Sequence, residues 1–94
     1  MNPVRDGKSW YVYVLRSLRD GETYTGSTND LRKRFKQHND GLSRSTKGRV
    51  PLELIYYEMS MNEHDARSRE LFLKSGMGKR YLKTRLKRFL SLTG

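Results

Sequence analysis

The chain contains no cysteine among its 94 residues. A protein without thiols has no disulfide framework, no thiolate zinc site and no cysteine nucleophile. The sequence also lacks a long apolar run. No window approaches the roughly 20 residues of a membrane-spanning helix, and the first residues do not form the apolar stretch of a signal peptide. We therefore expect a cytoplasmic protein with one domain over residues 1–94, in which residues 1–8 form a loose N-terminal tail.

Acidic residues are scarce as well. Ten Asp and Glu stand against twenty Lys and Arg, which gives a formal net charge of +10. This imbalance favours a polyanionic partner, and nucleic acid is the commonest one. A merely soluble basic surface and an anionic membrane surface are the alternatives. The membrane is disfavoured because no expected helix separates a large apolar face from a basic one without needing that face for the core.

Three strands are expected from local composition. Residues 10–15 are aromatic and β-branched without clean polar alternation, which is typical of a central strand buried on both faces. Asp20-Gly21 is a turn signal, so residues 23–25 should pair with the first strand as an antiparallel hairpin. A polar, basic loop over 42–48 precedes the third strand, residues 52–57.

The remaining segments predict three helices, over residues 31–39, 63–75 and 79–91. Residues able to cap the first two helices precede them: Thr28, Asn29, Asp30, Ser60 and Asn62. We expect Gly76-Met77-Gly78 to break the second helix from the third. The order strand, strand, helix, strand, helix, helix predicts an α+β fold with helices packed on a three-stranded antiparallel sheet.

One face of the first helix carries Leu31, Arg34, Phe35 and His38 at helical spacing. A nine-residue helix needs tertiary packing, so Leu31 and Phe35 should face the sheet, with Arg34 and His38 flanking them. Arg34 could then offer its planar fork to a phosphate, and His38 could donate to a phosphate oxygen. The alternative is that both residues only border the apolar stripe.

The second helix places Glu70 in a stripe with Ala66, Leu73 and Met77, where an apolar residue would be expected. A carboxylate at the edge of a core is costly unless a cation or a donor compensates it. A divalent ion such as Mg²⁺, held by one carboxylate, water and a substrate phosphate, is one possible partner. A surface ion pair with Lys74, four residues on, is the alternative.

Five of the six tyrosines lie in or beside expected strands, where tyrosine is a good strand former and needs no functional role. Tyr13 and Tyr24 differ, because pairing of the first two strands could bring both hydroxyls to one site. A tyrosine near a metal-bound water can act as a general base if the cation lowers its pKa.

Basic residues gather in the loop after the first helix and in the last helix. Such clusters can track a phosphate backbone, although part of them is only a solvated face. Candidate nucleic-acid-binding residues are Arg44, Lys47, Arg49, Lys79, Arg80 and Lys83. No sequence pattern is typical of a Walker loop, a zinc cluster or a Ser-His-Asp arrangement.

These residues together resemble the GIY-YIG nuclease family. The resemblance covers residues 10–82, and it rests on Tyr11-Val12-Tyr13, Tyr24-Thr25-Gly26, Arg34, His38 and Glu70 in the family's order and spacing. The chain is similar to small stand-alone bacterial members, which are related to the N-terminal domain of the excinuclease C subunit. The resemblance implies an endonuclease that hydrolyses phosphodiester bonds in branched or damaged DNA, with little sequence specificity.

The resemblance also implies a role for each matching position. Glu70 would be the single protein carboxylate on a divalent ion, Mg²⁺ or Mn²⁺. Arg34 would hold the scissile phosphate and stabilise charge in the transition state. Tyr13 and Tyr24 would orient or deprotonate the attacking water, and His38 would assist proton transfer or contact the phosphate.

Gly26 would allow a tight strand-to-helix turn beneath the site. The chain departs from the family pattern at three points. Tyr11 replaces the leading glycine of the first motif, and Thr25 replaces the isoleucine of the second. No asparagine follows Glu70, where many family nucleases carry one. A non-catalytic nucleic-acid-binding module that retains the fold is therefore the alternative reading.

Overall fold

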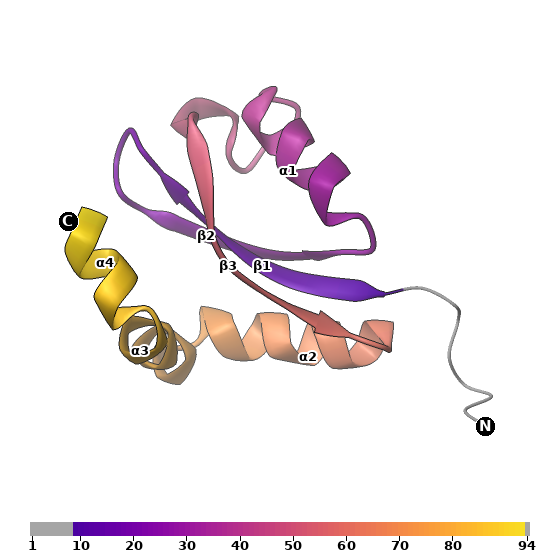
Figure 1. The fold of residues 1–94 in the computed structure, drawn as a ribbon. Helices are drawn as coiled ribbons and strands as arrows, with labels where there is room; N and C mark the ends of the chain where they lie inside the picture. The colour runs from indigo at the N-terminus through magenta and orange to yellow at the C-terminus, as the bar shows by residue number, and fades with distance from the viewer. Residues whose placement is uncertain (1–8, 94) are drawn as a thin grey trace.

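The computed structural model describes residues 9–93, so the expected tail over residues 1–8 lies outside the described residues. Three antiparallel strands form one sheet in the order β2-β1-β3 (Figure 1). Their bounds are β1 (Trp10–Ser17), β2 (Thr23–Thr28) and β3 (Leu52–Ser60). The expected α+β fold and the central position of the first strand are confirmed.

The helices cover both faces of the sheet (Figure 1). α1 (Leu31–Asn39) lies on one face, and α2 (Glu63–Lys74) lies on the other. α3 (Gly76–Arg85) and α4 (Lys87–Thr93) follow α2 at the C-terminal end of the chain. None of the helices in the described part of the chain is long and apolar enough to cross a membrane.

β1 supplies the centre of two hydrophobic clusters, because alternate side chains of a strand point to opposite faces. Val12 and Val14 pack with Ala66 and Leu73 of α2. On the other face, Tyr13 and Leu15 pack with Leu52, and the half-buried Leu31 and Phe35 of α1 cover them. The sheet therefore holds α1 and α2 at fixed positions on its opposite faces.

Side-chain caps begin the first two helices, as the sequence predicts. The Asp30 carboxylate accepts a hydrogen bond from the backbone N–H of Lys33 at the start of α1. The Asn62 side chain accepts from the N–H groups of His64 and Asp65 at the start of α2. Each cap satisfies backbone donors that have no partner within the helix.

The segment 76–78 does not act as a helix breaker, contrary to expectation. Ser75 caps α3 by accepting from the N–H of Gly78, so this segment forms the first turn of α3. Met77 is 65% exposed and does not extend the buried stripe of α2, because that helix ends at Lys74. The expected last helix over 79–91 is instead two helices, α3 and α4, with Leu86 between them.

Candidate active site

The centre of the candidate site is the point where the Tyr13 side chain extends from β1 over Gly26 of β2. Tyr13 pairs with Gly26 in the β1–β2 ladder. A Cβ atom at Gly26 would lie 2.6 Å from the Tyr13 hydroxyl oxygen and 3.1 Å from the Tyr24 ring. Gly26 belongs to β2 and not to a turn, which corrects the sequence expectation. Because Gly26 has no side chain, the buried Tyr13 hydroxyl can occupy the space beside it.

A buried hydrogen-bond chain fixes Tyr13 from the other side. The Tyr13 hydroxyl lies 2.8 Å from Nε2 of His38, and Nδ1 of His38 lies 2.7 Å from the Thr46 hydroxyl. Tyr13 is 1% exposed, and His38 and Thr46 are fully buried. The Tyr24 ring lies beside His38, with the ring centroids 5.1 Å apart and the ring planes tilted by 56°. The chain therefore sets the position of the Tyr13 hydroxyl.

Burial keeps Tyr13 and His38, the two titratable members of this hydrogen-bond chain, uncharged. It lowers the pKa of His38 to about 4, with a further contribution from the nearby Arg34 cation. Burial also raises the pKa of Tyr13 to about 12, although Arg34 opposes the increase. At neutral pH one His38 nitrogen therefore donates a hydrogen bond and the other accepts one, so the chain can pass a proton between Tyr13 and Thr46.

His38 does not border the apolar stripe of α1 as the sequence suggests, because the loop carrying Thr46 closes over it. The imidazole contacts the site through its hydrogen bond to the Tyr13 hydroxyl and through the Tyr24 ring. Sequence analysis missed Thr46, and a threonine in a polar loop carries no local signal of such a contact. Only the serine and threonine content of the loop beside a helical histidine could have suggested it.

Arg34 is the residue of α1 best placed to meet an anion. Its guanidinium donates to Gln37 over 3.2 Å and to the Ser43 hydroxyl over 3.4 Å. These two neutral partners hold the fork without neutralising its charge. With Thr28, Lys33 and other residues, Arg34 lines a hollow of about 260 Å³. A phosphate oxygen would meet two cationic side chains there, beside the Asp30 carboxylate that caps α1.

Glu70 approaches β2 from the opposite face of the sheet. Its carboxylate accepts hydrogen bonds of 2.7 Å from the Ser27 hydroxyl and from the Lys74 ammonium. Burial alone would raise the pKa of the Glu70 carboxyl, but these two hydrogen bonds outweigh it, and the pKa lies below its usual value. Glu70 thus lies at the edge of the core, and it makes the ion pair with Lys74 that the sequence raised as the alternative to a metal.

The described residues contain no cluster of three or more His, Asp or Glu side chains that could enclose a metal ion. Glu70 nevertheless suits a weakly held divalent ion, because its carboxylate is ionised and only partly buried, although the Lys74 ammonium would have to leave it first. Mg²⁺ commonly binds through one carboxylate together with water and substrate phosphate. The donor set fits an ion that binds with the substrate, not a permanent structural metal.

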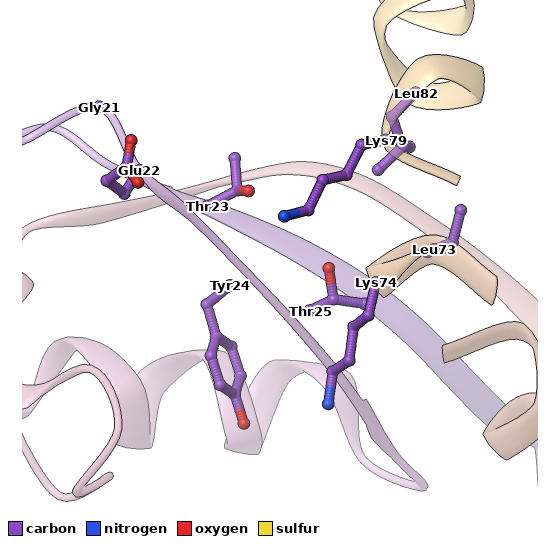
Figure 2. A pocket seen from close by; sticks show the side chains of 9 residues that line it. All are labelled: Gly21, Glu22, Thr23, Tyr24, Thr25, Leu73, Lys74, Lys79 and Leu82. Carbon is purple, nitrogen blue, oxygen red and sulfur yellow. The ribbon is translucent and has the colours of Figure 1, made fainter. Parts of the chain in front are cut away.

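A cleft of about 460 Å³ separates β2 from α2 and α3. Figure 2 shows Lys74 and Lys79 extending from the two helices towards β2, where Thr25 lies on the facing side. The Tyr24 ring points to the other side of the strand, beside His38. The two cations are suitable contacts for a phosphate backbone, although the Glu22 carboxylate also lines the cleft. The cleft thus extends the candidate site from Glu70 towards α3.

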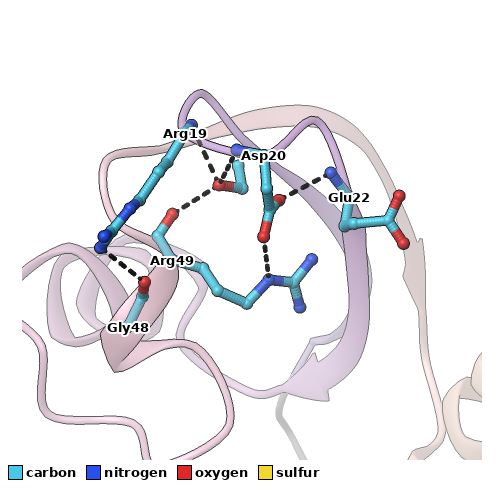
Figure 3. Close-up of polar contacts among 6 residues, drawn as sticks. Arg19, Asp20, Glu22, Gly48 and Arg49 are labelled. Carbon is cyan, nitrogen blue, oxygen red and sulfur yellow. Dashed lines mark hydrogen bonds and ion pairs between the residues drawn. The ribbon is translucent and has the colours of Figure 1, made fainter.

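The candidate nucleic-acid-binding residues differ in availability. Arg49 is half-buried: its guanidinium pairs with Asp20 over 3.3 Å, and its carbonyl accepts from the Ser17 hydroxyl (Figure 3). Arg19 completes this junction by donating to the Gly48 carbonyl. These contacts connect the short 3₁₀ helix Lys47–Arg49 to the β1–β2 hairpin. The other five candidates are exposed: Arg44, Lys47, Lys79, Arg80 and Lys83.

Comparison with known proteins places this site in a wider context. Residues 9–89 match the family model of the GIY-YIG catalytic domain. A UPF0213 protein of Clostridium perfringens is 46% identical over 65 residues, which cover 68% of this chain and 69% of that protein. A UPF0213 protein of Pediococcus pentosaceus is 40% identical over 85 residues, covering 89% and 88% respectively.

A solved structure shows the same similarity. The solution NMR structure of the UPF0213 protein BH0048 of Bacillus halodurans is 33% identical in sequence, with a TM-score of 0.50. The match covers 81% of this chain and 83% of that one. Sequence and fold thus agree over the part of the chain that contains the candidate site.

Proposed function

Because the chain belongs to the GIY-YIG family of nuclease domains, we propose that it is an endonuclease that hydrolyses phosphodiester bonds in DNA with one divalent ion. The substrate would be selected by shape, such as a branch or a lesion, because the cationic side chains of the site suit contacts to the phosphate backbone, which carry no sequence information. The relatives are bacterial proteins, and we place the activity in the bacterial cytoplasm, where the chromosome lies.

The observation that carries the proposal is the passage of Tyr13 over Gly26. It brings the Tyr13 hydroxyl to β2. Arg34 of α1 lies on one face of the sheet at this strand, and Glu70 of α2 lies on the other. The charges of both residues act on the pKa of Tyr13, Arg34 lowering it and Glu70 raising it. An attacking water, a phosphate and a carboxylate-bound cation could therefore meet at this strand.

Each side chain would then have a distinct task. Arg34 would bind the scissile phosphate and stabilise the charge that develops on it. Tyr13 and Tyr24 would orient the attacking water, and the neutral His38 would assist proton transfer by holding the Tyr13 hydroxyl in place through their hydrogen bond. Glu70 would hold Mg²⁺ or Mn²⁺ after Lys74 moves aside, and the ion supplies charge neutralisation at the phosphate and the leaving oxygen.

A cleavage assay on supercoiled, linear and branched DNA with Mg²⁺, Mn²⁺ or EDTA tests the proposal. We expect metal-dependent products from the wild type and a loss of about 100-fold or more in Arg34→Ala and Glu70→Gln. Glu63→Gln is the matched control, because Glu63 also lies on α2 and pairs with a cation four residues on, Arg67. Equal cleavage by Glu70→Gln and Glu63→Gln would refute the assigned role of Glu70.

A non-catalytic nucleic-acid-binding module is the second candidate, and the Lys74–Glu70 ion pair favours it. An ammonium group occupies the position beside the carboxylate where a metal would bind, and no asparagine follows Glu70 in the sequence. In this case the protein would bind DNA or an RNA control in EDTA with strong salt dependence. It would yield no product on any substrate, and Glu70→Gln would leave binding unchanged.

A further inference from the structure

Two tyrosines form an accessible aromatic pair on the α1 face of the sheet. Tyr11 of β1 and Tyr57 of β3 have ring centroids 6.2 Å apart, with an angle of 59° between the ring planes. Tyr57 is 55% exposed, and Tyr11 is half-buried. Met59, the cross-strand partner of Tyr11, is 52% exposed and extends the apolar surface. Packing within this domain thus leaves much of the pair open to solvent.

The pair forms one wall of a small cavity at the start of α1. The cavity has a volume of about 280 Å³ and is also lined by Asn29, Asp30, Leu31 and Arg32. This volume is near the lower end of the range for small-molecule sites. Arg32 is exposed. The carboxylate of Asp30 accepts from the N–H of Lys33 as the cap of α1, and this is the only acidic group in the lining.

The composition of this cavity suits a nucleobase with its phosphate. Aromatic rings stack on the faces of bases irrespective of sequence, and an adjacent guanidinium can contact the phosphate or stack on the base. The Asn29 amide can both donate to and accept from a base edge. The net charge of +10 favours a polyanion over a neutral or cationic partner at such a surface.

The cavity also lies close to the candidate catalytic centre. Tyr57 pairs directly with Tyr13 in the β1–β3 ladder, and Tyr11 is two residues from Tyr13 along β1. Adjacent strands are about 4.8 Å apart, and alternate residues of one strand about 7 Å apart. A base held by Tyr11 and Tyr57 would therefore belong to a nucleotide close to the scissile phosphate, not to a remote part of the strand.

We propose that Tyr11, Tyr57 and Arg32 form a stacking site for an unpaired base of the strand that is cleaved. The inference rests on the proposed function and narrows its substrate to DNA with a single-stranded or splayed segment beside the cut. Bases inside a duplex cannot stack on a protein ring without leaving their own stack, so continuous duplex DNA would not use this site.

Binding in EDTA tests this inference separately from cleavage. Fluorescence anisotropy would follow a labelled single strand, an equally long abasic strand and a duplex. We expect Tyr57→Ala to weaken binding of the single strand about 5- to 150-fold and binding of the duplex less than 2-fold. Tyr57→Phe should bind as the wild type does, because it keeps the ring. Leu18→Ala is the matched control, since Leu18 is 58% exposed and lies in the β1–β2 hairpin turn.

The outcomes separate the two proposals. A preference for the single strand over the abasic strand that Tyr57→Ala abolishes supports the stacking site even if no DNA is cleaved. Cleavage of duplex and single strand alike, unchanged in Tyr57→Ala, overturns the stacking site and leaves the nuclease intact. The inference is also overturned if Tyr57→Ala alters only the sedimentation of the protein, because the pair would then bind a second copy of this chain.

Discussion

At the residue scale, His38 shows what the sequence can and cannot reveal. Its position on α1 and its resemblance to a family histidine single it out as a candidate. The fully buried imidazole and its partner Thr46 follow from a loop folding over the helix, which no helical spacing encodes. Gly26 is a similar case: the motif marks the glycine, but the reason for it, the Tyr13 hydroxyl, lies on another strand.

The buried His38 predicts a pH-dependent stability. Its folded pKa of about 4 lies below the ordinary value of 6.5, so the unfolded chain binds a proton that the folded chain excludes. The free energy of unfolding should therefore fall as the pH decreases from 7 to 5, by about 2 kcal/mol from this group. Urea denaturation at both pH values measures it.

Two histidine variants provide the comparison for this prediction. His38→Gln should show a smaller decrease between pH 7 and pH 5 than the wild type, because it removes the group that titrates. His64→Gln, which removes an exposed imidazole on α2, should retain the wild-type decrease. Equal decreases in His38→Gln and the wild type would contradict the assignment.

At the scale of elements, the sequence predicts the strands and the starts of α1 and α2 because those signals are local. Strand composition and capping residues act over a few positions. The junction after α2 is different. Glycines usually end helices, yet Gly76 and Gly78 begin α3, since Ser75 caps the turn and the absence of a side chain at Gly78 lets α3 approach α2. Tertiary contact here overrides the local preference.

Gly78→Ala should destabilise the protein strongly. A Cβ atom at this position would overlap the backbone carbonyl oxygen of Phe72 and lie 2.5 Å from the Cα atom of Leu73, and backbone atoms cannot yield as a side chain can. We expect a loss of roughly 1–3 kcal/mol in the free energy of unfolding, or more.

Gly76→Ala is the matched control for the same helix turn. Its nearest atom would be Nη1 of Arg80 at 3.9 Å, which is an ordinary contact. This variant should be neutral or slightly more stable, by up to about 1 kcal/mol. Similar urea midpoints for the two alanine variants would show that close packing does not explain Gly78.

At the scale of the whole molecule, the basic side chains differ in whether they are available to a partner or are paired within the fold. The sequence predicts a polyanionic partner from its +10 charge, but it does not show which cations are available. Lys79 faces the cleft beside β2, whereas Arg49 is used within the fold to hold the hairpin. The division depends on ion pairs between distant segments, so it emerges only from the folded chain.

The salt dependence of DNA binding tests which basic side chains contact the phosphates. Each phosphate contact contributes about 0.9 to the slope of log affinity against log salt concentration on duplex DNA. Lys79→Ala should lower the slope by about that amount when a duplex is titrated in EDTA at several salt concentrations. Lys36→Ala should leave it unchanged, because Lys36 pairs with Asp40 on α1. An equal reduction in both variants would mean that overall charge, and not the cleft, governs binding.

The contact between the Tyr13 hydroxyl and Gly26 has a consequence for the protein before it has finished folding. The contact exists only when β1 and β2 are paired, and its neighbours Arg34 and Glu70 arrive only when helices have docked on both faces of the sheet. A nascent or damaged chain therefore has no assembled centre. Under the proposed endonuclease function, this dependence would protect the genome, since incomplete copies could not cut the chromosome.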